Sequence, residues 1–516
     1  MTDSLAAQAA PASTLTPGVA SHAEAGRIVG RNMLALVLSQ FVTTPVSIVV
    51  NAMLARALGA TSFGAIYLAS TVLSVGFLLV DWGGRGQVAA EIARDRKSAP
   101  AIFGTGLLLR IGLAAAVLAA LPACARLMGY DAPVRLALGI LGLRFAIVSL
   151  GDLCNGVLRG FEKIDWQARA TVAGNLIEAA LVIATLLLGG GLKAALTAQV
   201  VAVSITLCVQ VALMSRLHMG RPRIDSVSAR LLVSGGLGFL FLDFVLKMQP
   251  YIDAAFLSRL APPQALGWYS AAQRISGVLI FPSLTLNLAL YPTLARLWKH
   301  DRATHEKMMR IGLRLVIVLG VLAGTGTAIF APFIVSIVYG KEAWAPAAAD
   351  LAVLAAYVLL VYTTIVLGAG IASARRQFRW ALAQSFCLVV SVALDPLLIP
   401  WAQARYGNGS LGVCISVVVA ETFMVTAGVL ILPHGRKLNL GRTVRRALLA
   451  GAAMGAIGYL LRGLPAIAIP ATVLAYGGAL WLQGEIDSDL AMLVRMAFVN
   501  KLARRSGAAP AEPQAT

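Results

Sequence analysis

Long uncharged windows recur along the whole chain. Windows without Asp, Glu, Lys or Arg cover residues 32–55, 194–215, 275–295, 315–340, 351–374 and 463–484. Each is long enough to cross the roughly 30 Å hydrocarbon core of a bilayer as a helix. The windows are continuously apolar instead of alternating at period two, which indicates helices and not barrel strands. The predicted fold class is therefore an all-α, polytopic membrane protein.

Apolar windows bounded by charged and turn residues predict about fourteen transmembrane helices. These helices are expected at 29–54, 64–84, 101–124, 134–157, 168–188, 192–214, 231–257, 267–295, 309–336, 349–373, 379–399, 408–432, 444–461 and 465–484. The loops between them are short, so we expect no soluble domain to be inserted among the helices.

The distribution of Lys and Arg tests this helix count, because cytoplasmic loops of membrane proteins hold an excess of both. With the N-terminus inside, most of the 43 Lys and Arg residues fall in loops that would face the cytoplasm. A missed or added helix would invert this bias beyond the error. Both termini are therefore predicted to be cytoplasmic, and the formal net charge of +20 reflects topology more than nucleic-acid binding.

Composition excludes several other functional classes. The chain is 59% hydrophobic and 13% charged, whereas ordinary soluble domains contain roughly 25% charged residues. It has no recognisable nucleophile triad, phosphate loop or dinucleotide fingerprint, and its Cys and His residues are not spaced as metal ligands. We therefore expect a protein that is not an enzyme and that needs no cofactor or metal.

Two similar turns indicate an internal repeat. Arg56 and Gly64 bound the first turn, Arg259 and Gly267 bound the second, and the spacing is the same in both. The resulting organisation is a disordered cytoplasmic tail (1–26), an N-lobe of six helices (27–215), a C-lobe of six helices (216–433), two further helices (434–485) and a cytoplasmic tail (486–516). Two parallel lobes that rock about a central site are an architecture of transporters.

A series of motifs follows this repeat. The motifs are Ala55 to Gly64, Asp81-Trp82-Gly83-Gly84, Leu158 to Lys163, Tyr251-Ile252-Asp253, Leu266 to Ala272, Tyr291-Pro292 and Val338-Tyr339-Gly340. Their order resembles that of the polysaccharide transporter or O-antigen flippase family, within the multidrug/oligosaccharidyl-lipid/polysaccharide exporter superfamily. The resemblance covers roughly residues 27–432. One departure is Tyr67, since the family more often has its Tyr one residue earlier.

The resemblance implies a flippase that works by alternating access in the bacterial inner membrane. Such a protein moves undecaprenyl-diphosphate-linked oligosaccharide units from the cytoplasmic to the periplasmic leaflet, for O-antigen (lipopolysaccharide), capsule or exopolysaccharide synthesis. The partners would be this lipid-linked oligosaccharide, membrane lipids, other polysaccharide assembly proteins, and H⁺ or Na⁺ as a coupling ion. The alternatives are a cation-coupled multidrug exporter of the same superfamily and, from another class, a membrane-embedded polysaccharide polymerase or ligase.

Cations within the expected spans are the first candidate site residues, because a charge at mid-membrane costs at least about 2.5 to 3.5 kcal/mol. Arg110, Arg144, Lys247 and Arg274 are predicted to line a cationic cavity that binds the substrate diphosphate. The alternative interpretation is that acids neutralise them and tie helices together. Asp243 lies one turn before Lys247, and Asp152 and Glu178 are the acids that would reach Arg110 and Arg144 across helices.

Uncharged polar residues and acids complete the candidate site. Gln40, Thr44, Ser47 and Asn51 share one helix face and are expected to line the cavity, or alternatively to hydrogen-bond neighbouring helices. The candidates for coupling to H⁺ or Na⁺ are Asp243, Asp253, Glu178 and Glu421. Asp253 and Arg274, at similar depth on adjacent helices, would form either an ion pair or part of a coupling site.

Overall fold

The computed structural model describes residues 17–82, 84–433 and 435–485. Side chains are described from Ser39 onward, except at 85, 289, 436, 437 and most positions between 237 and 246. Regular structure in this part of the chain is helical, and eleven helical stretches are long and apolar enough to cross a membrane. The predicted all-α membrane fold is confirmed.

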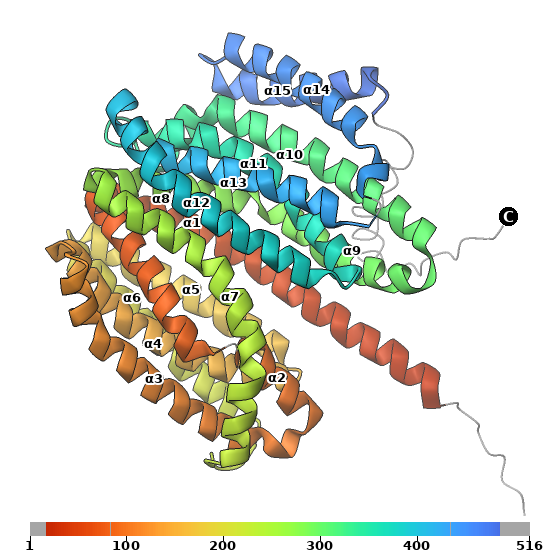
Figure 1. The fold of residues 1–516 in the computed structure, drawn as a ribbon. Helices are drawn as coiled ribbons and strands as arrows, with labels where there is room; N and C mark the ends of the chain where they lie inside the picture. The colour runs from red at the N-terminus through yellow and green to blue at the C-terminus, as the bar shows by residue number, and fades with distance from the viewer. Residues whose placement is uncertain (1–16, 83, 434, 486–516) are drawn as a thin grey trace, which may run out of the picture.

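The helices follow one another with short connections (Figure 1). The first lobe contains α1 (Pro17–Asp81), α2 (Gly84–Arg94), α3 (Ala99–Leu127), α4 (Ala132–Gly160), α5 (Ile164–Leu187) and α6 (Leu192–Ser215). The second lobe contains α7 (Ser226–Leu260), α8 (Pro263–Leu279), α9 (Phe281–His300), α10 (Arg302–Val338), α11 (Ala345–Ser373), α12 (Gln377–Tyr406) and α13 (Ser410–Ile431). Helices α14 (Gly441–Leu460) and α15 (Pro465–Leu482) pack on each other and on α10.

The helices match the predicted spans, with local differences. The first two spans are two helices that share the label α1 and are separated by a kink at Gly59, where φ is +74° and ψ is 170°, a conformation open to glycine. The eighth span is divided into α8 and α9 at Ile280, next to Pro282 in the first turn of α9. Helix α2 was expected to be a loop, and α1 begins at Pro17, inside the tail expected for 1–26.

Helix α2 is short and amphipathic, which explains why a search for long apolar windows misses it. Val88 and Ile92, four residues apart, are buried on one face, whereas Arg94 is exposed. Helix α2 packs against α4 and α7. Its 11 residues are too few to cross the roughly 30 Å hydrocarbon core as a helix.

The two lobes meet at one end of the bundle and diverge toward the other (Figure 1). The two turns of the sequence repeat lie at the meeting end, which we call the closed end. A Cβ added to Gly64 would lie 2.8 Å from the Gly267 nitrogen, and one added to Gly267 would lie 2.1 Å from the Ala60 carbonyl oxygen. The absence of side chains at these repeated glycines therefore permits α1 and α8 to touch.

The repeated arginines join the lobes at the closed end. The Arg56 side chain on α1 donates a hydrogen bond from Nε to the carbonyl of Val338 (2.9 Å) and another from Nη2 to the carbonyl of Ile337, at the C-terminus of α10. The Arg259 side chain on α7 donates to the carbonyl of Met128, at the C-terminus of α3. Each cation lies where terminal carbonyls lack partners and the helix dipole is negative. The two lobes are thus joined by a reciprocal pair of helix caps.

The N-terminal end of α7 is attached to the first lobe. Gln87 and Trp82 donate side-chain hydrogen bonds to the carbonyls of Leu231 (2.6 Å) and Val233 (2.8 Å). Asp225, which caps α7, accepts hydrogen bonds from the backbone and hydroxyl of Ser228, and these lower the pKa of its carboxyl group. The other end of α7 packs on α12. One helix therefore spans both lobes.

Replacing Arg56 and Arg259 with alanine tests the reciprocal caps. We expect each change to lower stability by about 0.3 to 1 kcal/mol, the usual contribution of a cation at a helix C-terminus. The double variant should also label faster at a cysteine introduced at Ala60, which is 8% exposed. Lys341→Ala is the matched control, because Lys341 is an exposed cation at the same end. Unchanged melting and labelling in the double variant would contradict the caps.

Candidate functional site

A cavity of about 1020 Å³ lies between the lobes, and we call it the central cavity. Its walls come from α1 and α5 of the first lobe and from α8, α9 and the end of α10 of the second lobe. It extends from Val338 and Tyr339 at the closed end to Ser39 and Leu288. Because both lobes contribute walls, a change in their relative position would change access to this cavity.

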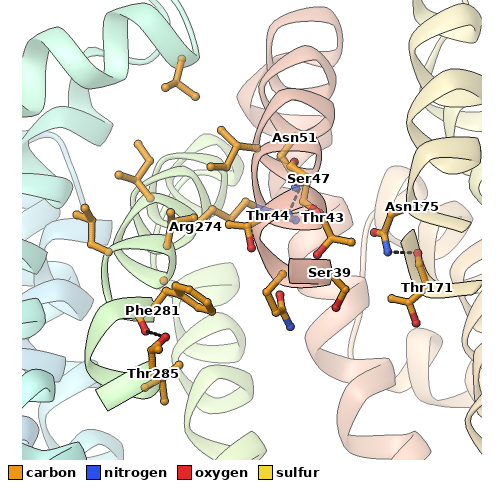
Figure 2. Close-up of a pocket in the computed structure, with 18 of the residues that line it drawn as sticks. Ser39, Thr43, Thr44, Ser47, Asn51, Thr171, Asn175, Arg274, Phe281 and Thr285 are labelled. Atoms are coloured by element: carbon orange, nitrogen blue, oxygen red, sulfur yellow. Dashed lines mark hydrogen bonds between the residues drawn. The ribbon is translucent and has the colours of Figure 1, made fainter. Parts of the chain in front are cut away.

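The first-lobe wall is mostly polar (Figure 2). Gln40, Thr44, Ser47 and Asn51 line it together with Ser39 and Thr43 of α1 and Thr171 and Asn175 of α5. The face of α1 identified from helical spacing thus lies on the cavity wall. These hydroxyl and amide groups can donate and accept hydrogen bonds.

Arg274 of α8 reaches across this cavity toward α1 (Figure 2). Its guanidinium donates a hydrogen bond to Oδ1 of Asn51 and lies 5.0 Å from the centre of the Phe63 ring. Its Nε is buried without a hydrogen-bond partner. Among the described residues, no carboxylate lies within ion-pair distance of Arg274. The cavity therefore contains a guanidinium held by an amide and an aromatic ring.

An aromatic cluster separates Arg274 from the closed end. The Phe63 ring packs edge-on against Trp344, with centroids 5.7 Å apart, and Tyr339 stacks on Trp344 at 5.1 Å. The Tyr339 hydroxyl donates to the carbonyl of Ala271, one turn from Arg274. Arg274 thus lies next to the aromatic contacts at the closed end, on the side that faces the central cavity.

The other predicted cations lie elsewhere. Arg144 forms an ion pair with Glu178 across α4 and α5, at 3.0 Å. Arg110 is buried 3.6 Å from Asp81 and donates to the carbonyl of Ser149, beside a small cavity of about 230 Å³. Neither residue is among those lining the central cavity.

The central cavity lining does not include Lys247 either, although this residue lies on α7 and is half-buried. The side chain of its predicted partner, Asp243, lies outside the described residues. The structure therefore does not test their pairing.

A second cavity, of about 600 Å³, lies inside the second lobe, and we call it the C-lobe cavity. It is lined by residues of α7, α8, α9, α11, α12 and α13, including Asp253 and Glu421. Leu284 and Asn287 line both cavities. The two cavities are therefore neighbours that share a wall on α9.

Two buried acids lie beside each other in the second lobe, and one of them, Asp253, lines the C-lobe cavity. Asp253 accepts a hydrogen bond from the Tyr269 hydroxyl (3.1 Å), and its other oxygen is buried without a partner. The neighbouring carboxyl of Asp395, on α12, is fully buried beside Asp253 and Ser416, with no basic side chain among the described residues as a partner for it. Two adjacent carboxylates cannot both stay ionised in such surroundings without a cation, so the pair must hold a proton or a cation.

Asp253 was a sequence candidate, whereas Asp395 was not distinguished from the other acids. The only sequence signal for Asp395 is an acid within an apolar helix, and other acids share that feature. Asp253 and Arg274 do not pair with each other: they are directed at different cavities. In the described part of the chain, no group of three or more His, Cys, Asp or Glu residues could hold a metal ion.

A family model described as "Polysaccharide biosynthesis protein" matches residues 29–298, more than half of the chain. The chain belongs to this family. A second model, MatE, matches residues 243–397. No protein of curated function matches the sequence. The predicted family is confirmed, and the second match agrees with the predicted superfamily.

Solved structures show the same fold. The "Lipid II flippase MurJ, inward closed conformation" matches with a TM-score of 0.70 at 12% identity, covering 91% of this chain and 100% of that one. A "multidrug resistance MATE family transporter of the MOP superfamily" matches in its inward-facing conformation with a TM-score of 0.65 at 17% identity, covering 79% and 97%. The outward-facing conformation of a transporter so described has a TM-score of 0.55 at 17% identity, covering 79% and 95%. The chain thus has a polytopic transporter fold and overlays better on the inward-facing arrangement.

The Arg144–Glu178 pair yields a test that separates a structural tie from substrate binding. Arg144→Gln or Glu178→Gln alone leaves a charge without its partner, and we expect each to lower stability by roughly 2 kcal/mol. The double variant should recover most of that loss, which melting of the purified protein would measure. An Arg144→Gln variant that keeps full stability but loses transport would instead assign Arg144 to the substrate.

Proposed function

We propose that this protein is a flippase for undecaprenyl-diphosphate-linked oligosaccharide, working by alternating access without covalent chemistry. The observation that carries the proposal is Arg274, which lines a cavity between two lobes with no carboxylate beside it among the described residues. Membership of the polysaccharide biosynthesis protein family supports a substrate that carries sugars.

The chemistry of the central cavity fits such a substrate. Burying a guanidinium away from water costs free energy unless an anion compensates its charge. A diphosphate provides paired oxygens that match the planar donors of a guanidinium. The hydroxyls and amides of α1 and α5 suit sugar hydroxyl groups. Apolar residues such as Leu284 and Leu288 line the remaining wall, where a lipid chain would be compatible.

The distribution of Lys and Arg supports the direction of transport. It predicts both termini on the cytoplasmic side and the closed end on the opposite side, which by the family resemblance would be the periplasmic side of the bacterial inner membrane. The described state would then accept substrate from the cytoplasmic side. Release on the other side requires Arg56 and Arg259 to leave the carbonyl groups that they cap.

Asp253 and Asp395 are our candidates for coupling to H⁺ or Na⁺, because two adjacent buried carboxyls bind either cation favourably. The other three acids predicted from the sequence as coupling residues are placed differently. Glu178 is paired with Arg144, Glu421 lines the C-lobe cavity, and the side chain of Asp243 is not described.

A cation-coupled multidrug exporter is the second candidate function. The C-lobe cavity combines the acids Asp253 and Glu421 with the aromatic residues Tyr291, Tyr357 and Trp380, which would suit an organic cation. Arg274 opposes this role in the central cavity because it would repel a cationic drug. No specific feature of the described chain favours the polymerase or ligase alternative.

Reconstitution into proteoliposomes tests the flippase function directly. The native protein should move undecaprenyl-diphosphate-linked oligosaccharide between leaflets, as measured by enzymatic access to the sugar from outside. Arg274→Ala should slow this by about 10- to 100-fold, the effect of losing charge-assisted hydrogen bonds of roughly 1.5 to 3 kcal/mol. Arg274→Lys should retain part of the rate, and Arg96→Ala, at an exposed ion pair, should change nothing. Equal rates in native and Arg274→Ala protein would refute the proposed role of Arg274.

Ion coupling is tested by imposing H⁺ or Na⁺ gradients on the same vesicles. Asp253→Asn and Asp395→Asn should each remove the gradient-dependent part of flipping while leaving exchange without a gradient within about threefold, since either change removes one of the two buried charges. Glu91→Gln, at an exposed ion pair on α2, is the control. Full gradient stimulation in both aspartate variants would exclude this pair as the coupling site.

A further inference from the structure

The lining of the C-lobe cavity is unusually rich in side-chain amides. Gln249, Gln273, Asn287 and Gln384 line it, together with the carboxylates Asp253 and Glu421 and the aromatic residues Tyr291, Tyr357 and Trp380. Its volume of about 600 Å³ lies within the range of about 300 to 1,000 Å³ typical of small-molecule sites. The cavity is therefore large enough for a short oligosaccharide and contains the polar groups to orient one.

Two residues that line this cavity carry an acceptor without a partner. Oδ1 of Asn287 and Oδ1 of Asp253 are buried without a hydrogen bond in the described structure. Asp253 is 1% exposed. Buried acceptors are normally satisfied, so these two side chains, which line the cavity, have unused acceptor capacity that a donor in the cavity would satisfy if the side chain turned toward it. Sugar hydroxyl groups are such donors, and amides can both donate to and accept from them.

The C-lobe cavity also lies close enough to Arg274 for one substrate to reach both. Gln273 and Arg274 are consecutive on α8, and successive residues of a helix point in directions about 100° apart. Gln273 lines the C-lobe cavity and Arg274 lines the central cavity. Asn287 borders both. A headgroup whose phosphate contacts Arg274 can thus extend its sugars past Asn287.

From this arrangement we propose that the C-lobe cavity binds the sugar portion of the lipid-linked substrate and selects neutral or amine-bearing sugars over acidic ones. This inference rests on the proposed flippase function and deepens it. Asp253 and Glu421 accept hydrogen bonds from hydroxyl or ammonium groups, whereas a hexuronate carboxylate beside them would be repelled. Phosphate and sugar therefore occupy cavities of opposite charge preference.

The test uses three synthetic lipids on the same polyprenyl diphosphate: a single N-acetylhexosamine, a neutral tetrasaccharide, and that tetrasaccharide ending in a hexuronate. In proteoliposomes the native protein should flip the neutral tetrasaccharide about tenfold faster than the hexuronate form, because of charge repulsion. Glu421→Gln should raise the rate of the hexuronate form relative to that of the neutral tetrasaccharide several-fold, because it removes one of the two carboxylates.

A second variant tests the amides. Gln384→Leu should slow the neutral tetrasaccharide about 3- to 10-fold, the effect of losing one or two hydrogen bonds, and leave the monosaccharide lipid unchanged. Ser385→Ala, at the next residue of α12, is the matched control because Ser385 bonds to its own helix at Ala381 and does not line the cavity.

The outcomes separate the two proposals. Equal flipping of neutral and hexuronate lipids by the native protein would overturn sugar selection while the flippase function stands. Equal slowing of all three lipids by Glu421→Gln would also overturn it and assign Glu421 to coupling. Failure of the native protein to flip any of the lipids, together with export of tetraphenylphosphonium that Glu421→Gln abolishes, would overturn both proposals in favour of the drug exporter.

Discussion

Hydrocarbon cannot solvate a charge, and the structure of this protein depends on how that cost is met. Arg144 is neutralised by Glu178, and Arg110 lies beside Asp81, so these cations stabilise the packing of the first lobe. Arg274 is treated differently, because an amide and an aromatic ring hold it at the edge of a cavity. A ligand of opposite charge gives the largest electrostatic stabilisation where a buried charge has no counter-charge of its own. The proposed site follows from this contrast.

The two lobes share one plan at the closed end and differ in their interiors. Gly64 and Gly267 allow close approach, and the reciprocal arginine caps join each lobe to a helix end of the other. By contrast, the acid pair and the amide-lined cavity belong to the second lobe. The repeated turns therefore close one end of the bundle, and the departure from symmetry gives the proposed phosphate, sugar and ion sites separate positions.

The sequence was sufficient for the fold, because membrane crossing depends on local hydropathy that a window of about 20 residues captures. The same window could not find α2, whose apolar face is too short. Helical spacing placed Gln40 to Asn51 on one face, since that relation lies within a single helix. Whether Arg144 faces Glu178 or a cavity depends on the rotation of two helices about their axes. Likewise, Asp395 gains significance only through its tertiary neighbour, Asp253.

Gln273 and Arg274 are consecutive on α8 and line different cavities. This limits how the sequence of α8 can change over evolutionary time. Each residue inserted into or deleted from the preceding turns of α8 would rotate both side chains by about 100°, so that one would take the direction of the other and the other would leave its cavity. Substitutions at lipid-facing positions of α8 leave that orientation intact. At its lipid-facing positions the helix should therefore tolerate changes of residue type far better than changes of length.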